Sequence, residues 1–123
     1  MQRLGDLQLQ VMELVWQFGR ATVSEVYEEL RRHRKIAYTT VLTTMRALER
    51  HGMVAHEARG KAYLYHPLVS RDAYTEARLD RFVDDLFDGR KEKLLCHLLG
   101  AERVSAGELR RIRRMLSENR TGK

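Results

Sequence analysis

Apolar residues recur at helical spacing in three stretches near the start of the chain. The stretches cover residues 7–18, 22–30 and roughly 39–51, and such spacing is typical of amphipathic helices. The apolar positions on their inner faces are Leu7, Val11, Leu14, Val15, Phe18, Val23, Val26, Tyr27, Leu30, Val41, Met45 and Leu48. The pattern therefore predicts three short helices that share one hydrophobic core.

Polar and glycine residues mark the ends of these helices. Gly19 and Gly52 follow the first and third stretches, where glycine commonly ends a helix. Thr22 and Glu25 have the spacing of a capping box, in which the threonine hydroxyl accepts a bond from the glutamate amide and the carboxylate reaches back. The basic run at 31–35 fits a solvated end of the second helix.

After the third stretch the pattern changes to a period of two residues. Residues 53–57 and 62–66 are predicted to be short strands, and Gly60 between them can supply the positive φ of a tight turn. Pro67 is expected to end the second strand because it has no amide to donate. Three helices followed by a hairpin in about 65 residues is the order of a winged helix. Residues 1–69 are thus predicted to form a winged helix-turn-helix head.

The rest of the chain, residues 70–123, is expected to be helical. Gly89 and Gly100 separate three amphipathic segments, and Ser105 with Glu108 has the spacing of a second capping box. These segments carry more apolar surface than a small head can cover, so we expect a homodimer formed through this domain. The residues expected at the dimer interface are Leu79, Phe82, Val83, Leu86, Leu94, Leu95, Leu98, Leu109 and Ile112. The predicted fold class is mainly α with a small β-hairpin wing.

Composition narrows the class of protein. The 123 residues are 43% hydrophobic and 33% charged, which suits a folded domain rather than a disordered tail. Lys and Arg total 23 against 17 Asp and Glu, and the net charge of +6 favours an anionic partner. The single cysteine, Cys96, is expected to be a small buried hydrophobe. No apolar run is long enough for a membrane span or a signal peptide, so we expect a cytoplasmic protein without membrane insertion.

No arrangement of residues indicates an enzyme. The five histidines are scattered, and no serine or cysteine is paired with a histidine in a recognised signature. No Cys/His spacing resembles a closed zinc site. We therefore expect no catalytic activity, no cofactor and no metal.

The third predicted helix offers the best candidate for a binding surface. Its outward face carries Thr39, Leu42, Thr43, Arg46 and Arg50. The second helix of a helix-turn-helix places its N-terminal residues against base edges, where threonine hydroxyls, methyl groups and a guanidinium all find partners. The alternative is an ordinary solvated helix face, which would more usually carry Glu and Lys.

The tip of the predicted wing carries two cations. Arg59 and Lys61 flank Gly60 and are expected to contact DNA phosphates, which position a protein without reading sequence. The alternative is that charges at a hairpin tip keep edge strands from aggregating. Tyr63 and Tyr65 alternate along the second strand and are expected to pack in the core.

Five segments spread along the chain form a recognisable arrangement. They are Leu7-x-x-x-Val11-Met-Glu-Leu-Val-Trp16, Ala37-Tyr-Thr-Thr-Val-Leu-Thr-Thr-Met45, Gly60-Lys-Ala-Tyr-Leu-Tyr-His66, Phe82-Val-Asp-Asp-Leu-Phe-Asp-Gly89 and the stretch from Glu108 to Leu116. In this order, over nearly the whole chain, they resemble the penicillinase-repressor family (BlaI/MecI/CopY). The resemblance implies a bacterial homodimeric winged-helix repressor that binds a palindromic operator in double-stranded DNA. By position, the DNA-reading helix falls on Thr39, Thr40, Leu42, Thr43 and Arg46.

The resemblance also implies how repression ends. In members that control β-lactamase genes, a membrane sensor-protease signals the antibiotic, and the repressor is cleaved in its dimerisation region. By position, cleavage falls near His97 and Leu98. The Asn-Phe pair associated with cleavage in the best-known members is absent here, as is the Cys-x-Cys of the copper-responsive branch, so metal sensing through thiolates is not expected.

Two other classes of function fit the same pattern. One is a winged helix that binds a protein rather than DNA, and a salt titration on a palindromic duplex separates it from a phosphate-binding head. The other is a repressor that senses a small molecule held between the head and the dimerisation helices. Thermal shifts with candidate ligands separate this sensor from a repressor released by a protease.

Overall fold

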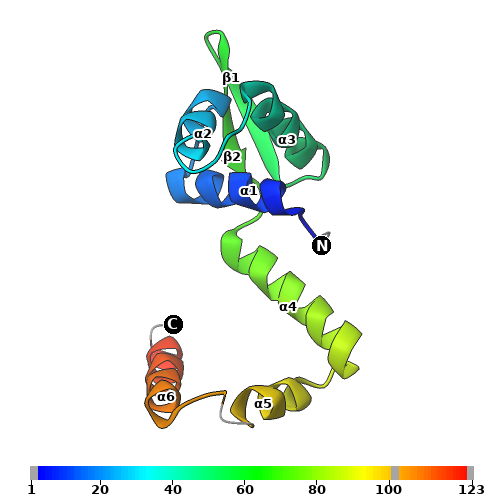
Figure 1. Cartoon of the computed structure of the whole chain (residues 1–123), viewed down its shortest axis with the longest axis vertical. Helices are drawn as coiled ribbons and strands as arrows, with labels where there is room; N and C mark the ends of the chain where they lie inside the picture. The colour runs from blue at the N-terminus through cyan, green and yellow to red at the C-terminus, as the bar shows by residue number, and fades with distance from the viewer. Residues whose placement is uncertain (1–2, 101–102, 122–123) are drawn as a thin grey trace. The chain divides into compact units, whose positions relative to one another are not determined.

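The computed structural model describes residues 3–100 and 103–121 (Figure 1). The internal contacts of the chain fall into two compact units, Met1–Arg78 and Leu79–Lys123. The first unit contains the predicted head, and the second contains all the residues predicted to dimerise.

The first unit is a winged helix. Its helices are α1 (Asp6–Phe18), α2 (Val23–Leu30) and α3 (Tyr38–Arg50), followed by the strands β1 (Val54–Arg59) and β2 (Ala62–Pro67). The strands pair antiparallel, and their hairpin extends beyond the helices as a wing (Figure 1). This order of elements confirms the predicted fold class.

The inner face of α3 lies in the core as predicted. Val41, Met45 and Leu48 have no exposed surface, and they recur at the three- and four-residue spacing of one helix face. Thr44 is also buried, and its hydroxyl donates a 2.7 Å hydrogen bond to the carbonyl of Thr40. This local bond satisfies the hydroxyl, which would otherwise be costly to bury.

The buried stripe of α1 differs from the predicted one. Val11, Met12 and Val15 are buried, whereas Leu14 is half-buried and Phe18 is 40% exposed. Residues of a helix turn by about 100° each, so a stripe centred on Val11 and Val15 includes Met12 and leaves Phe18 at its edge. The prediction that Phe18 points inward was wrong for this reason.

Local capping explains where α2 and the wing turn begin. The Thr22 amide donates to the Glu25 carboxylate at 2.9 Å, and the Glu25 amide donates to the Thr22 hydroxyl at 3.1 Å, which confirms the predicted capping box. Gly60 has a φ of 62° between the strands. A left-handed residue at this position is what a two-residue hairpin requires, so the predicted turn is also confirmed.

The two tyrosines of β2 differ in their surroundings. Tyr65 is buried, and its backbone exchanges two hydrogen bonds with Ala21, at 2.8 and 2.9 Å. Tyr63 is half exposed and stacks on His56, with ring centroids 4.2 Å apart. The prediction for Tyr65 is confirmed and that for Tyr63 was wrong, because residues two apart on a strand share a face but only one lies over the helices.

The first turns of α4 (Arg71–Phe87) are attached to the head. Trp16 donates its indole Nε1–H to the carbonyl of Val69 at 2.8 Å, and the Leu4 amide donates to the Tyr74 hydroxyl at 3.0 Å. Arg71 also forms an ion pair with Glu13, with 3.0 Å between Nε and Oε2. The core of the first unit therefore includes Tyr74 of α4. That residues 1–69 form a domain of their own stays a prediction.

The second unit continues α4 and adds α5 (Lys91–Leu99) and α6 (Ala106–Thr121). Ser105 and Glu108 exchange the two hydrogen bonds of the predicted capping box, at 3.0 and 3.1 Å. The large apolar side chains of this unit are mostly exposed, by 39% to 64%, and they are Leu79, Phe82, Leu86, Leu95, Leu98, Leu99, Ile112, Met115 and Leu116. Isolated exposed leucines are ordinary, but so many in one unit indicate an interaction surface.

Two side chains of this unit differ from their predicted environment. Cys96 is exposed, so the expectation that it is buried was wrong. The reason is that no residue of α5 is buried by the rest of the chain. Val83 is only 4% exposed and is already covered by its own chain. It therefore offers little surface to a partner, unlike Leu79 and Phe82.

Candidate nucleic-acid interface

The outward face of α3 presents most of the residues predicted to read DNA. Thr39, Thr40, Thr43, Arg46 and Arg50 are all exposed along this helix. Their hydroxyls and guanidinium groups can donate to phosphate oxygens or to base edges.

Leu42 lies at the border of this face. It is half-buried and packs against the head core, so it is less exposed than the outward position predicted from the sequence. The reason is that α2 and β2 approach α3 from that side: Leu42 lines a groove together with Thr22 and Tyr63. Its remaining surface still faces outward beside Thr43.

The tip of the wing presents Arg59 and Lys61 as predicted. Arg59 pairs with Ala62 at the last rung of the hairpin, and Lys61 belongs to the turn. Within the described part of the chain, neither cation forms an ion pair with a carboxylate, and the same holds for Arg46 and Arg50. These four charges are therefore available to neutralise phosphates, which dominate the affinity of proteins for DNA.

A groove of about 220 Å³ joins α3, the wing and the start of α2. Tyr38 and Leu42 of α3, Lys61 and Tyr63 of the wing and Ser24 of α2 are among its lining residues. The start of a helix carries free amide groups and a partial positive charge, which favour phosphate. Sequence reasoning omitted the α2 start from the candidate contacts, although the Thr22 capping box marked its position.

A cluster of polar and aromatic side chains ties the wing to α3. His56 of β1 lies 2.7 Å from the Glu49 carboxylate, measured from Nδ1 to Oε2, and stacks on Tyr63. Burial raises the pKa of the nearby Tyr65 phenol, and the Glu49 carboxylate raises it further. Because Glu49 lies on α3 and His56 on β1, this cluster joins α3 to the wing.

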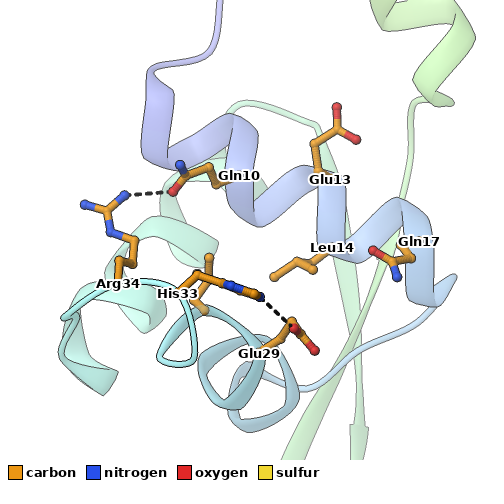
Figure 2. A pocket seen from close by; sticks show the side chains of 8 residues that line it. Gln10, Glu13, Leu14, Gln17, Glu29, His33 and Arg34 are labelled. Carbon is orange, nitrogen blue, oxygen red and sulfur yellow. Dashed lines mark hydrogen bonds and ion pairs between the residues drawn. The ribbon is translucent and has the colours of Figure 1, made fainter.

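A second cavity, of about 550 Å³, lies between α1 and the end of α2 (Figure 2). Leu14 and Leu30 provide its apolar lining, and the Glu29 carboxylate accepts from His33 at one rim, at 3.3 Å. At the opposite rim Arg34 donates to Gln10 at 2.7 Å (Figure 2). This cavity belongs to the head alone and differs in place from the ligand site predicted between head and dimerisation helices.

The residues predicted at the cleavage site lie on α5. His97 and Leu98 are both exposed, and the His97 ring contacts Phe87 with centroids 5.4 Å apart. Leu94 and Leu109 are half-buried, while the other predicted interface residues are exposed apart from Val83. In the described ranges there is no group of three His, Cys, Asp or Glu residues placed to hold a metal, and no helix suited to crossing a membrane.

Comparison with known proteins supplies the family. The model of the penicillinase repressor family matches residues 4–118, almost the whole chain. The chain belongs to this family. These findings support a transcriptional repressor of this family with a DNA-binding domain, and DNA as its partner.

Individual members of the penicillinase repressor family are similar to this chain over nearly its whole length. The transcriptional regulator BlaI of Mycobacterium tuberculosis is 34% identical over 98% of this chain and 87% of its own. The penicillinase repressor of Bacillus licheniformis is 22% identical over 98% and 94%. The methicillin resistance regulatory protein MecI of Staphylococcus aureus is 19% identical over 94% of both chains.

A solved structure supports the assignment of the head. The solution structure of the DNA-binding domain of the repressor BlaI superposes with a TM-score of 0.54 at 25% identity. It covers 58% of this chain and 88% of that domain.

Proposed function

We propose that this repressor acts as a homodimer that binds a palindromic operator and blocks transcription in the bacterial cytoplasm. The observation that carries the proposal is a set of four exposed cations that, within the described residues, form no ion pair. Arg46 and Arg50 lie on α3, and Arg59 and Lys61 lie on the wing. Two copies related by a two-fold axis would place their α3 helices about 34 Å apart, or a multiple of that distance, on one face of the duplex.

The exposed apolar surface of the second unit supports the homodimer. Leu79, Phe82 and Leu86 recur on one face of α4, and each is at least 44% exposed in the single chain. Covering such side chains is favourable by about 1.5–3 kcal/mol for each that becomes fully buried. We assign the same role to the other exposed or half-exposed members of the predicted interface, which are Leu94, Leu95, Leu98, Leu109 and Ile112.

Release by a sensor-protease is the third part of the proposal. The exposed His97–Leu98 bond lies in α5, where cleavage would cut the dimerisation region and leave the head intact. A protease binds extended backbone, so α5 has to open locally before it is cut, and a helix of nine residues packed on few neighbours opens easily. We propose a β-lactamase or another antibiotic-response gene as the regulated target.

The experiment that tests the proposal selects fragments of the source genome bound by the full chain, followed by footprinting. We expect protection of an inverted repeat upstream of a gene, with affinity that falls steeply as salt rises. A chain that binds every duplex equally, or shows no salt dependence, would favour the protein-interaction alternative instead.

The cavity between α1 and α2 favours a second candidate function, in which a small molecule releases the repressor. Its size suits a ligand of modest size, and it adjoins the segment that leads from α2 into α3. Thermal shift measurements with candidate inducers test this function, because a ligand that binds the folded state raises the unfolding temperature, and the rise grows with ligand concentration relative to Kd.

A further inference from the structure

One face of α4 is a continuous row of carboxylates. Asp72, Glu76, Asp80 and Asp84 recur at every fourth residue and are all exposed. Side chains four residues apart lie one above the other on a helix, and like charges there repel. Within the described residues, Asp80 and Asp84 form no ion pair with any cation of this chain.

One face of α6 carries the opposite charge. Arg110, Arg111, Arg113 and Arg114 are exposed. Arg110 and Arg114 lie opposite the apolar face formed by Ile112 and its neighbours one turn away, and Arg111 and Arg113 lie at the borders of that face. In the described ranges none of the four forms an ion pair with a carboxylate. Pairs three or four residues apart again have like charge, so this helix also repels itself.

Within the described residues no ion pair joins either row to its own chain, although Arg111 interacts electrostatically with Glu108 of the same helix. In the part of the chain that the structure describes, α6 packs extensively against no other element. Both rows lie beside exposed apolar residues: Asp80 follows the exposed Leu79 on α4, and Arg113 follows the exposed Ile112 on α6. A surface that covers the apolar face of either helix would therefore also meet its charged border.

We propose that the carboxylate row of α4 in one copy pairs with the arginine row of α6 in a second copy. This inference rests on the proposed homodimer and adds how its two copies recognise each other. A two-fold axis makes every α4–α6 contact occur twice, so both rows are neutralised in both copies. Apolar burial has no direction, whereas complementary charges fix register and exclude wrong partners.

DNA phosphate is the competing partner for the arginine row. It would neutralise Arg110 and Arg113 but leave the carboxylates of α4 unpaired, and an acidic face is repelled by DNA. A second copy satisfies both rows at once. The complementary spacing of the two rows, each at one helical turn, therefore favours the chain itself as the partner.

A charge exchange tests the proposal in the full chain. The variants are D80K/D84K, R110E/R113E and the combination of all four substitutions. R20E/K35E on the exposed surface of the first unit is the charge-matched control for R110E/R113E. Sedimentation velocity without DNA measures the dimer Kd at about 50 mM and about 500 mM salt, where charges are screened weakly and strongly. Far-UV circular dichroism reports the helical content of each variant.

We expect each one-sided variant to raise the dimer Kd at least about tenfold at low salt, since attraction becomes repulsion at two symmetric places. The combined variant should recover most of the loss, and the control should match the wild type. Unchanged dimers in both one-sided variants, or no recovery in the combined variant, would overturn the pairing while leaving the homodimer standing.

The salt dependence of the wild-type dimer and DNA binding by R110E/R113E distinguish failure of the charge pairing from failure of the fold or of the homodimer. If a one-sided variant loses helix, the salt dependence of the wild-type dimer decides, because a dimer held only by apolar contacts does not weaken at high salt. If R110E/R113E weakens DNA binding and leaves the dimer unchanged, the arginines contact phosphate and the pairing is wrong. If the wild-type chain is monomeric at all concentrations measured, the proposed homodimer is wrong.

Discussion

Replacing Phe82 by alanine should weaken the dimer. A phenylalanine presents about 200 Å² when fully exposed, and the 44% that Phe82 leaves exposed amounts to about 90 Å² by that value. At about 25 cal/mol per Å² the burial of this surface contributes about 2 kcal/mol. Because a two-fold dimer contains the residue twice, the loss reaches about 4 kcal/mol, or up to about a thousandfold in Kd.

Sedimentation velocity over a concentration series measures this loss directly. Phe18→Ala is the matched control, since Phe18 is a phenylalanine of similar exposure, 40%, at the end of α1 in the first unit. Phe82 also contacts Phe87 in its own chain, at 6.0 Å between centroids, so circular dichroism has to show that α4 remains folded. Equal dimer affinity of Phe82→Ala and Phe18→Ala would refute the assignment of this face to the dimer.

Four further outcomes follow from the head and from α6. Arg46→Ala should cost about 1–3 kcal/mol on the operator and much less on a random duplex if the guanidinium grips a guanine; equal losses by fluorescence anisotropy would indicate a phosphate contact. R59A/K61A should weaken all duplexes alike and lower the salt slope by about 0.9 per lost phosphate contact, and an altered sequence preference would assign base reading to the wing. Replacing either Glu49 or His56 by alanine should lower the free energy of unfolding by about 0.5–1.5 kcal/mol. A double-mutant cycle by denaturant unfolding should show coupling between the two residues. Additive losses would mean that the 2.7 Å contact between Glu49 and His56 contributes nothing. The Ser105 backbone amide lowers the pKa of Glu108 by its hydrogen bond. The stabilisation of α6 by this carboxylate is therefore present above the ordinary pKa of 4.5 and is lost as pH falls through the lowered pKa. Glu108→Gln should abolish this loss of helix at acid pH, which circular dichroism measures.

The head could be predicted because its signals are local. The period of Val41, Met45 and Leu48, the Thr22 capping box and the turn glycine Gly60 each depend on residues close in sequence, and each was confirmed. Hydrophobic period fixes which face of a helix points inward to within about one residue. That margin explains why Met12 was missed on α1 and Phe18 was placed wrongly.

Contacts between distant segments could not be predicted in the same way. The pair formed by Glu49 and His56 depends on how β1 packs against α3, and the half-burial of Leu42 depends on α2 and β2 together. Val83 was expected to face a partner, yet it is only 4% exposed within its own chain. These features arise from tertiary packing, which periodicity within one segment does not contain.

The division into a DNA-binding unit and a unit with exposed apolar helices has a consequence for regulation. One head brings only a few cations to DNA, so the affinity of a single head is modest, and linking two heads makes the second contact intramolecular at an effective concentration of about millimolar. In the proposed dimer, the strength of the α4–α6 interface would therefore set operator occupancy without any change at α3. Cleavage near His97, or loss of the charge pairing between copies, would release the operator while both heads remain folded. The proposed dimer would thus be controlled through α4, α5 and α6, the helices that carry the exposed leucines and the two charged rows.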